Sequence, residues 1–244
     1  MLRSSTKRLR VALFPSRQGT GEDTHAHWDS RIAALENWFR EHKPTGALAD
    51  VVLSDHYVKY AHIPWSPTLE TPAELQMLAS ATFEAQFGDA AAAWDVCVDL
   101  PKYGRAGLAC AIDRSRLAQL QTVCAAHNAE LGGVQPYFML VFNHHRASIG
   151  QNAALLVIDN DKCVFASIRG DEWHSIRSLQ LPGSDADGIA VMIQREYLLQ
   201  GIDQQVHLFV HAKGNAGAAH LASRNATTLL EMPALDDLAS FGAN

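Results

Sequence analysis

The 244-residue sequence predicts a two-lobed α/β protein with mixed sheets that carry helices on both faces. Strand-like alternation of apolar residues gives way repeatedly to helix-like spacing along the chain. In the second half, three strands joined by tight turns precede alternating helices and strands, an order typical of a mixed sheet. Hydrophobic residues make up 48% and charged residues 19%, which suits a globular chain with a substantial core.

The first half predicts strands that alternate with helices, and its first strand leads through a Gly-rich loop almost directly to a helix. The first helix stops before Pro44, and the next begins at Thr71, where Glu74 completes a capping-box pattern. Asp113 caps a third helix, and Asn128 is a suitable stop for it. The predicted strands are residues 9–14, 49–53, 57–63, 93–98, 106–112 and 131–134. The predicted helices are residues 28–42, 72–87, 114–127 and 136–146.

The second half is the more diagnostic. Tight turns at residues 159–161 and 170–171 force three strands into an antiparallel meander. The predicted elements are, in order, strands 154–158, 163–168 and 173–181, helix 186–200, strand 205–211, helix 216–222, strand 227–231 and a helix from residue 235. This order is the ribonuclease H-like arrangement, and two such lobes make the actin-like ATPase fold. We predict a first lobe with an inserted subdomain at residues 1–150 and a second lobe at residues 151–244.

Charge and hydropathy limit the partners. The net charge of −6 offers no electrostatic reason to expect nucleic-acid binding. A small basic arm opens the chain, and we interpret it as a solvated tail, with attraction to an anionic membrane as the alternative. No window approaches the roughly 18 apolar residues of a membrane span, so we predict a cytoplasmic protein. The basic residues of the arm are Arg3, Lys7, Arg8 and Arg10.

Cysteines and histidines form no motif with metal-ligand spacing. The four cysteines are scattered, and we expect buried free thiols rather than disulfides or a zinc site. They are Cys97, Cys110, Cys124 and Cys163. His25 and His27 lack a third ligand at a motif spacing, so a polar pair before a helix is favoured over a metal site. His144 and His145 sit at a helix end, where the helix dipole accounts for them.

Several stretches match one family in the order in which that family has them. They are residues 51–60 (VVLSDHYVKY), 63–65 (IPW), 109–113 (ACAID), 134–137 (VQPY), 156–159 (LVID) and 169–173 (RGDEW). With these stretches the chain resembles the cytoplasmic actin-like assembly proteins of type IV pilus and type II secretion systems, the PilM and GspL type. The resemblance covers most of residues 48–181, and beyond residue 181 only the pattern of the fold matches.

The resemblance implies nucleotide loops, and this sequence departs from them. Actin-like ATPases hold phosphates on two Asp-x-Gly-type turns, whose backbone N–H groups face the anion. At the first turn, Pro15 and Ser16 lie in the stretch FPSRQ, which contains no Asp or Gly, and Pro15 lacks an N–H donor. At the second, Asp159 remains but the Gly of the Asp-x-Gly pattern is lost; the adenosine-binding glycines would fall near Gly214, in altered spacing. We therefore expect no cofactor and no metal.

The predicted function is a non-catalytic, protein-binding component of a type IV pilus or type II secretion-like inner-membrane assembly platform. The implied partners are other assembly proteins, with the cytoplasmic tail of an inner-membrane protein favoured, and the implied position is the inner face of that membrane. Two alternatives stay open: an actin-like protein that binds ATP and Mg²⁺ through divergent loops, and a ribonuclease H-like nuclease. Four aromatic residues could line a peptide groove, with core packing as the default interpretation: Trp65, Tyr137, Phe138 and Phe142.

Overall fold

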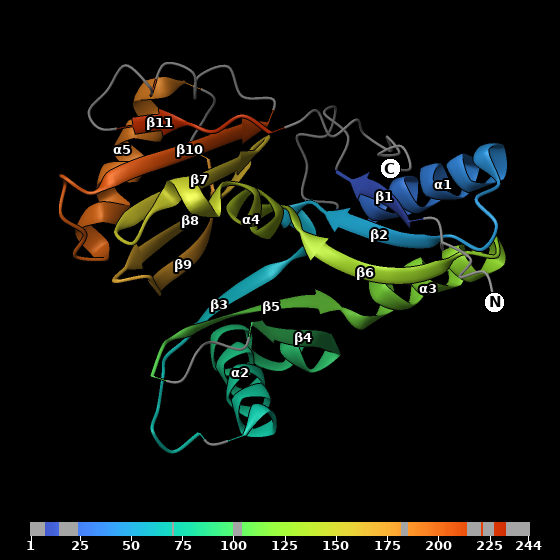
Figure 1. The fold of residues 1–244 in the computed structure, drawn as a ribbon, viewed down its shortest axis with the longest axis horizontal. Coiled ribbons are helices and arrows are strands. Elements are labelled where there is room, and N and C mark those ends of the chain that lie inside the picture. Colours follow the sequence, from blue (N-terminus) through green and yellow to red (C-terminus); the bar gives the residue numbers. More distant parts are fainter. Residues whose placement is uncertain are drawn as a thin grey trace, which may run out of the picture. The chain divides into compact units, whose positions relative to one another are not determined.

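The chain forms two compact units that interleave in sequence (Figure 1). The computed structural model describes residues 8–14, 24–69, 71–99, 104–181, 185–213, 221 and 227–232. Of these, unit 1 takes the residues up to Tyr57 and residues 113–140, and unit 2 takes residues 58–112 and 141–232. By its contacts, the inserted segment 58–112 therefore belongs to unit 2. The predicted division of the chain into two lobes at residue 150 stays a prediction.

Unit 1 is a parallel three-stranded sheet with two helices. The strand order is β1-β2-β6, and both pairings are parallel. Helix α1 contacts α3, and α3 contacts β6, so the two helices share one side of the sheet. The Asp113 carboxylate accepts the Ser115 N–H as the predicted cap, and Asn128 ends the helix region with φ 54°. The elements are β1 (Arg8–Leu13), α1 (Thr24–His42), β2 (Leu48–Leu53), α3 (Arg114–Ala126) and β6 (Glu130–Pro136).

Strand β6 contains a bulge that only glycine fits. The register with β2 shifts between Ala49 and Asp50, so Gly132 is the extra residue on the β6 side. A Cβ on Gly132 would lie 2.5 Å from Leu48 Cγ and 2.8 Å from Asp50 Oδ1. The close approach of the two strands therefore depends on the missing side chain.

The main sheet of unit 2 confirms the predicted meander. Strand β8 pairs antiparallel with both β7 and β9. On the other side of β7, β10 pairs with it in parallel, and β11 pairs in parallel with β10. The sheet order is β11-β10-β7-β8-β9. Apart from Leu221, the helices predicted at residues 216–222 and from residue 235 lie outside the described residues. The strands are β7 (Ala153–Asp159), β8 (Lys162–Arg169), β9 (Glu172–Gln180), β10 (His207–Lys213) and β11 (Thr227–Leu229).

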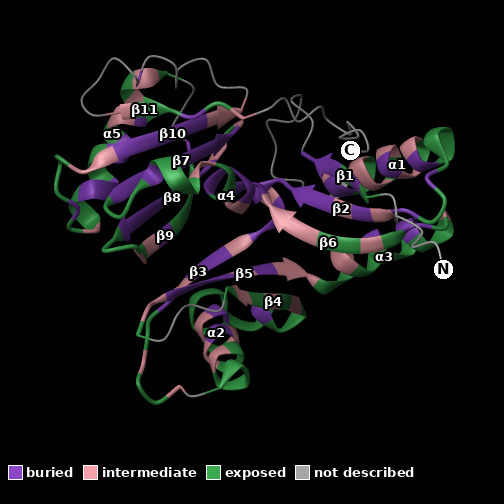
Figure 2. Ribbon diagram, viewed as in Figure 1, coloured by how far each residue is buried: buried purple, intermediate pink, exposed green. Residues whose placement is uncertain are grey.

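Both faces of this sheet are covered, and β7 is buried along its whole length (Figure 2). Helix α5 (Ala186–Leu199) packs its apolar side onto one face through a core cluster that includes Leu156, Phe165 and Ile189. On the other face lies α4 (Tyr137–Ile149), whose Phe142 ring centroid is 4.5 Å from that of Trp173 on β9. A strand with two covered faces must be apolar throughout, as the run AALLVI of β7 is.

The inserted segment of unit 2 forms a second small sheet with one helix. Its order is β3-β5-β4, and α2 packs on the sheet through Ala79 and Phe83. Thr71 and Glu74 form the predicted capping box, and Gly88 ends the helix with φ 64°. The elements are β3 (Lys59–Ile63), α2 (Pro72–Phe87), β4 (Trp94–Asp99) and β5 (Gly107–Asp113).

Several details differ from the sequence-based expectation. Pro136, expected to open a helix, is the last residue of β6. The first helix begins at Thr24, four residues before its predicted start at Trp28, since polar residues at its beginning hide the periodicity. The turn predicted between strands 49–53 and 57–63 is a 3-10 turn (Asp55–Tyr57), and the two strands join separate sheets. Cys124 and Cys163 are buried as expected, but Cys97 is exposed and Cys110 is only half-buried.

No described helix combines the length and the apolar character that crossing a membrane requires.

We expect Gly132→Ala to destabilise the protein by about 1–3 kcal/mol, because the new methyl group would force β2 and β6 apart. Gly133→Ala is the matched control, since the nearest atom to its Cβ would be 3.7 Å away, an ordinary contact. Urea unfolding of both variants measures the difference. Equal stabilities for the two variants would show that the bulge does not restrict residue 132.

Candidate functional site

Of the predicted phosphate-loop positions, Asp159 lies among the described residues. Pro15, Ser16 and Gly214 lie outside the described residues. Asp159 is described: it is the last residue of β7, and only 1% of its surface is exposed. The candidate site is therefore built from the turn between β7 and β8 and from the adjoining end of β10.

The β7–β8 turn is closed by contacts within the protein. Asn160 adopts φ 59°, in the left-handed region, which Asn tolerates better than most residues. Its backbone N–H donates to the carbonyl of Lys213 at 3.4 Å, and its Nδ2 donates to Asp159 Oδ1 at 3.2 Å. The backbone donor that a phosphate-binding turn would offer to an anion is bonded here to the neighbouring strand.

Asp161, the second residue of the turn, faces β9. Its Oδ2 accepts a hydrogen bond from Gln180 Nε2 at 2.8 Å, and its carbonyl accepts the Leu181 N–H at 2.8 Å. These contacts tie the turn to the far end of β9. Among the residues that the structure describes, no three His, Cys, Asp or Glu side chains are grouped so that they could hold a metal ion.

The end of β10 completes the site. Lys213 pairs with Asp159 in the parallel register of β10 and β7, so the two strands end together. In open α/β sheets, ligands bind at the carboxyl ends of parallel strands. A carboxylate, a backbone N–H and a lysine thus meet at the edge where a nucleotide would bind in this class of sheet.

Two histidines form hydrogen bonds with the backbone of the segment that follows β11. The His211 ring on β10 is 7% exposed, and its Nδ1 lies 2.8 Å from the carbonyl of Leu230. On α4, His145 Nε2 lies 3.1 Å from the carbonyl of Glu231. A ring nitrogen facing a carbonyl carries the proton, so each histidine donates. Burial lowers the pKa of both histidines.

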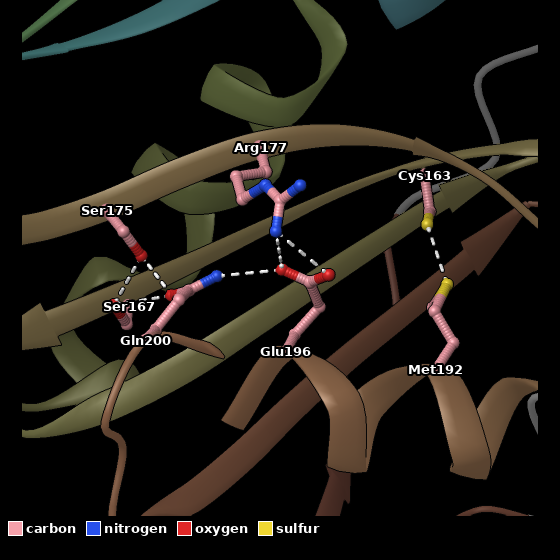
Figure 3. Close-up of polar contacts among 7 residues, drawn as sticks. All are labelled: Cys163, Ser167, Ser175, Arg177, Met192, Glu196 and Gln200. Atoms are coloured by element: carbon pink, nitrogen blue, oxygen red, sulfur yellow. Dashed lines mark hydrogen bonds and ion pairs between the residues drawn. The ribbon is translucent and has the colours of Figure 1, made fainter. Parts of the chain in front are cut away.

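A connected polar network lies between α5 and the sheet (Figure 3). Arg177 Nη1 on β9 donates to Glu196 Oε2 at 2.9 Å, although Glu196 is only 1% exposed. Gln200 Nε2 donates to the same oxygen at 3.1 Å, and the Gln200 carbonyl oxygen accepts from the hydroxyls of Ser167 and Ser175. The buried Glu196 carboxylate is thereby paired with a positive charge and hydrogen-bonded. The network connects the end of α5 to β8 and β9.

The sequence carried a signal for this network that was missed. Ser175 and Arg177 are two residues apart on β9. Glu196 in α5 and Gln200, the residue directly after this helix, are four residues apart. Such spacings place each pair on a single face of its element. They do not show that the two faces meet, which only the fold reveals.

In unit 1, a buried carboxylate caps a helix at the carboxyl end of β2. Asp55 is 1% exposed, and its Oδ1 accepts the backbone N–H of Phe138 at 3.2 Å in the first turn of α4. Ser54 bonds to the end of β1 through its N–H and the Leu13 carbonyl, at 2.9 Å. A negative side chain at a helix N-terminus is favourable, so a structural role explains Asp55.

Core packing explains three of the four aromatic candidates. Tyr137, Phe138 and Phe142 are buried, and the Tyr137 ring packs edge-on against Phe14 with centroids 4.9 Å apart. Trp65 is different, because 42% of its surface is exposed in the turn after β3. The histidine pair 144–145 lies in the second half of α4, where His145 Nε2 faces the Glu231 carbonyl.

Comparison with known proteins identifies the fold. The sequence matches no protein-family model and no curated protein. A Bacteroides thetaiotaomicron protein with an actin-like ATPase fold and unknown function matches with a TM-score of 0.59 and 13% identity, over 94% of each chain. The chain has the actin-like ATPase fold. The predicted fold class is therefore confirmed.

Two further structures of this actin-like fold carry functional names. The PilM–PilN type IV pilus biogenesis complex matches with a TM-score of 0.62 and 12% identity, over 93% of this chain and 89% of that chain. The cytoplasmic domain of EpsL, an inner-membrane component of the Vibrio cholerae type II secretion system, matches with a TM-score of 0.51 and 12% identity, over 93% and 84%. The predicted resemblance to the PilM and GspL type is thus supported at the level of the fold.

We expect the protein to lose stability as the pH falls from about 7 to 5, and His211→Asn to lessen that loss. Because burial lowers the pKa of folded His211 below its ordinary value of 6.5, the unfolded chain takes up a proton that the folded chain resists. The contribution of neutral His211 to the free energy of unfolding is complete above pH 6.5. It is lost as the pH falls from there through the pKa of folded His211.

Urea unfolding at several pH values measures this effect. Asn can still donate to the Leu230 carbonyl but does not titrate, so the pH-dependent loss should shrink. The rest of the loss comes from His62 and His145, whose pKa values burial also lowers. Unfolding at about pH 8, where the histidines are neutral, is the baseline, and identical pH profiles would contradict the assignment.

Proposed function

We propose that this protein is a non-catalytic, protein-binding component of a type IV pilus or type II secretion-like inner-membrane assembly platform. In this proposal the partners are other assembly proteins, and the cytoplasmic tail of an inner-membrane protein is the favoured one. The protein then works at the cytoplasmic face of that membrane, without nucleotide or metal.

The observation that carries the proposal is the fold match to two assembly proteins along almost the whole chain. The structure of one of them is named as a complex of PilM with PilN, and the other is the cytoplasmic domain of an inner-membrane secretion component. Each match spans more than four-fifths of both chains. A match of this extent includes every described sheet, so the proposal does not depend on one shared lobe.

The polar groups of the β7–β8 turn support a role without nucleotide. Asp161 stands where the Asp-x-Gly turn has glycine, and the N–H of Asn160 is directed to the Lys213 carbonyl. The Asp161 carboxylate is directed to Gln180. A nucleotide would have to displace these contacts before the turn could face its phosphates.

One observation favours the ATP-binding alternative. The hydrogen bond from Asn160 to Lys213 is 3.4 Å long, at the weak end of the range for an N–H donor. Its loss would cost little, and a lysine lies at the same edge of the sheet. The ribonuclease H-like nuclease has less support. Such an enzyme needs several carboxylates to hold two metal ions, and β7 and β10 contribute only Asp159.

Partner capture tests the proposal. The tagged chain is used as bait in a detergent extract of its own cells, with quantitative mass spectrometry of the captured proteins. An excess of the untagged chain is the control, because it competes away specific partners and leaves background unchanged. We expect pilin-assembly or secretion components, including an inner-membrane protein, to be captured and competed. If only unrelated proteins are competed, the proposal is wrong.

A further inference from the structure

Two cysteines share one face of the small sheet in unit 2. Val96 and Val98 of β4, like Ala109 and Ala111 of β5, pack into the core under α2. Because side chains alternate along a strand, the residue between each of these pairs points to the opposite face. Those residues are Cys97 on β4 and Cys110 on β5, and neither contributes to the core.

The two thiols are in contact. Strands β4 and β5 are hydrogen-bonded neighbours, and the Cys110 side chain forms a hydrogen bond with Cys97. The connection between the strands is shorter than the dozen residues that a parallel crossover needs, so the pair is antiparallel. Directly opposed residues of antiparallel strands have Cα atoms about 4.5–5.5 Å apart, within the range of about 4.4–6.8 Å for disulfides.

The surroundings of Cys97 favour its thiolate form, and its side chain is accessible. The hydrogen bond from Cys110 lowers the pKa of the Cys97 thiol to about 6, although burial and the carboxylates of Asp95 and Asp99 act in the other direction. Cys97 is exposed on the edge strand, where a small reagent can reach it. The other two described cysteines differ: burial raises the pKa of Cys124, and it raises that of Cys163 to about 12.

We propose that Cys97 and Cys110 form a redox-active dithiol, which low-molecular-weight disulfides oxidise to a disulfide bridge between β4 and β5. This assigns a thiol-modification site to the inserted sheet, and it stands independently of the proposed assembly function.

The reaction is thiol–disulfide exchange in two steps. The Cys97 thiolate attacks one sulfur of the small disulfide, forms a mixed disulfide and releases one small thiolate. Cys110 then attacks the Cys97 sulfur, loses its proton and releases the second small thiol. Two protein thiols are oxidised to one disulfide, and one small disulfide is reduced to two thiols. The bridge ties the edge strand β4 to the central strand of its sheet.

Glutathione disulfide is the probe for the test, with intact-mass analysis and peptide mapping of the full chain. We expect the wild-type protein to lose two hydrogen masses and to contain a Cys97–Cys110 linkage. Cys110→Ser should stop at a single glutathione adduct on Cys97, because the resolving thiol is gone. Cys97→Ser should remain largely unmodified. A stable adduct on the wild-type protein, or no reaction at Cys97, would overturn the proposal.

Alkylation by iodoacetamide provides a second readout that does not require the bridge to form. In the wild-type protein, the rate at Cys97 should rise with a midpoint near pH 6, since the pKa of its thiol is about 6. In Cys110→Ala, whose side chain has no donor, the midpoint should move toward that of a free cysteine, about 8.5, and the rate at pH 7 should fall by roughly two- to threefold. Equal profiles would show that Cys110 does not activate Cys97. Circular dichroism of each variant checks that the fold is kept.

Discussion

The pairing of β7 with β10 on one side and β8 on the other organises unit 2. β7 is buried from Ala153 to Asp159, so both faces of the sheet must be covered, and α5 and α4 supply the cover. The burial of an apolar strand contributes about 25 cal/mol for each Å² removed from water, which makes this strand a major source of stability. Its carboxyl end then determines where the Asp159 turn lies and which strand end, that of Lys213, lies beside it.

Local signals in the sequence predicted much of this architecture. The meander followed from two turns too short for any other connection, and the left-handed conformations of Asn160 and Asp171 confirm those turns. The capping box at Thr71 and Glu74 was equally local, because its two hydrogen bonds lie within four residues. Periodicity, turn residues and caps need only neighbours in sequence, and most of them were predicted correctly, although the start of α1 was not.

Features that depend on distant residues could not be predicted in the same way. Nothing near Ser54 shows that β2 and β3 belong to different sheets, because the choice of partner strand depends on burial elsewhere. Cys97 and Cys110 were expected to be buried, since both follow apolar residues, yet their faces depend on where α2 packs. The candidate site was predicted in part: Asp159 is where the pattern placed it, but the contacts that close its turn come from β9 and β10.

We propose that the edge formed by Asp159, Asn160 and Lys213 supports the fold instead of binding a nucleotide. Calorimetric titration of the full chain with ATP and Mg²⁺ is the measurement, with Asp161→Gly as the matched variant. This substitution restores the glycine of the Asp-x-Gly turn and removes the carboxylate that accepts from Gln180. We predict no saturable binding heat for the wild-type protein, and binding gained only by Asp161→Gly would agree with this proposal. Saturable, Mg²⁺-dependent binding by the wild-type protein would contradict it and favour the ATP-binding alternative.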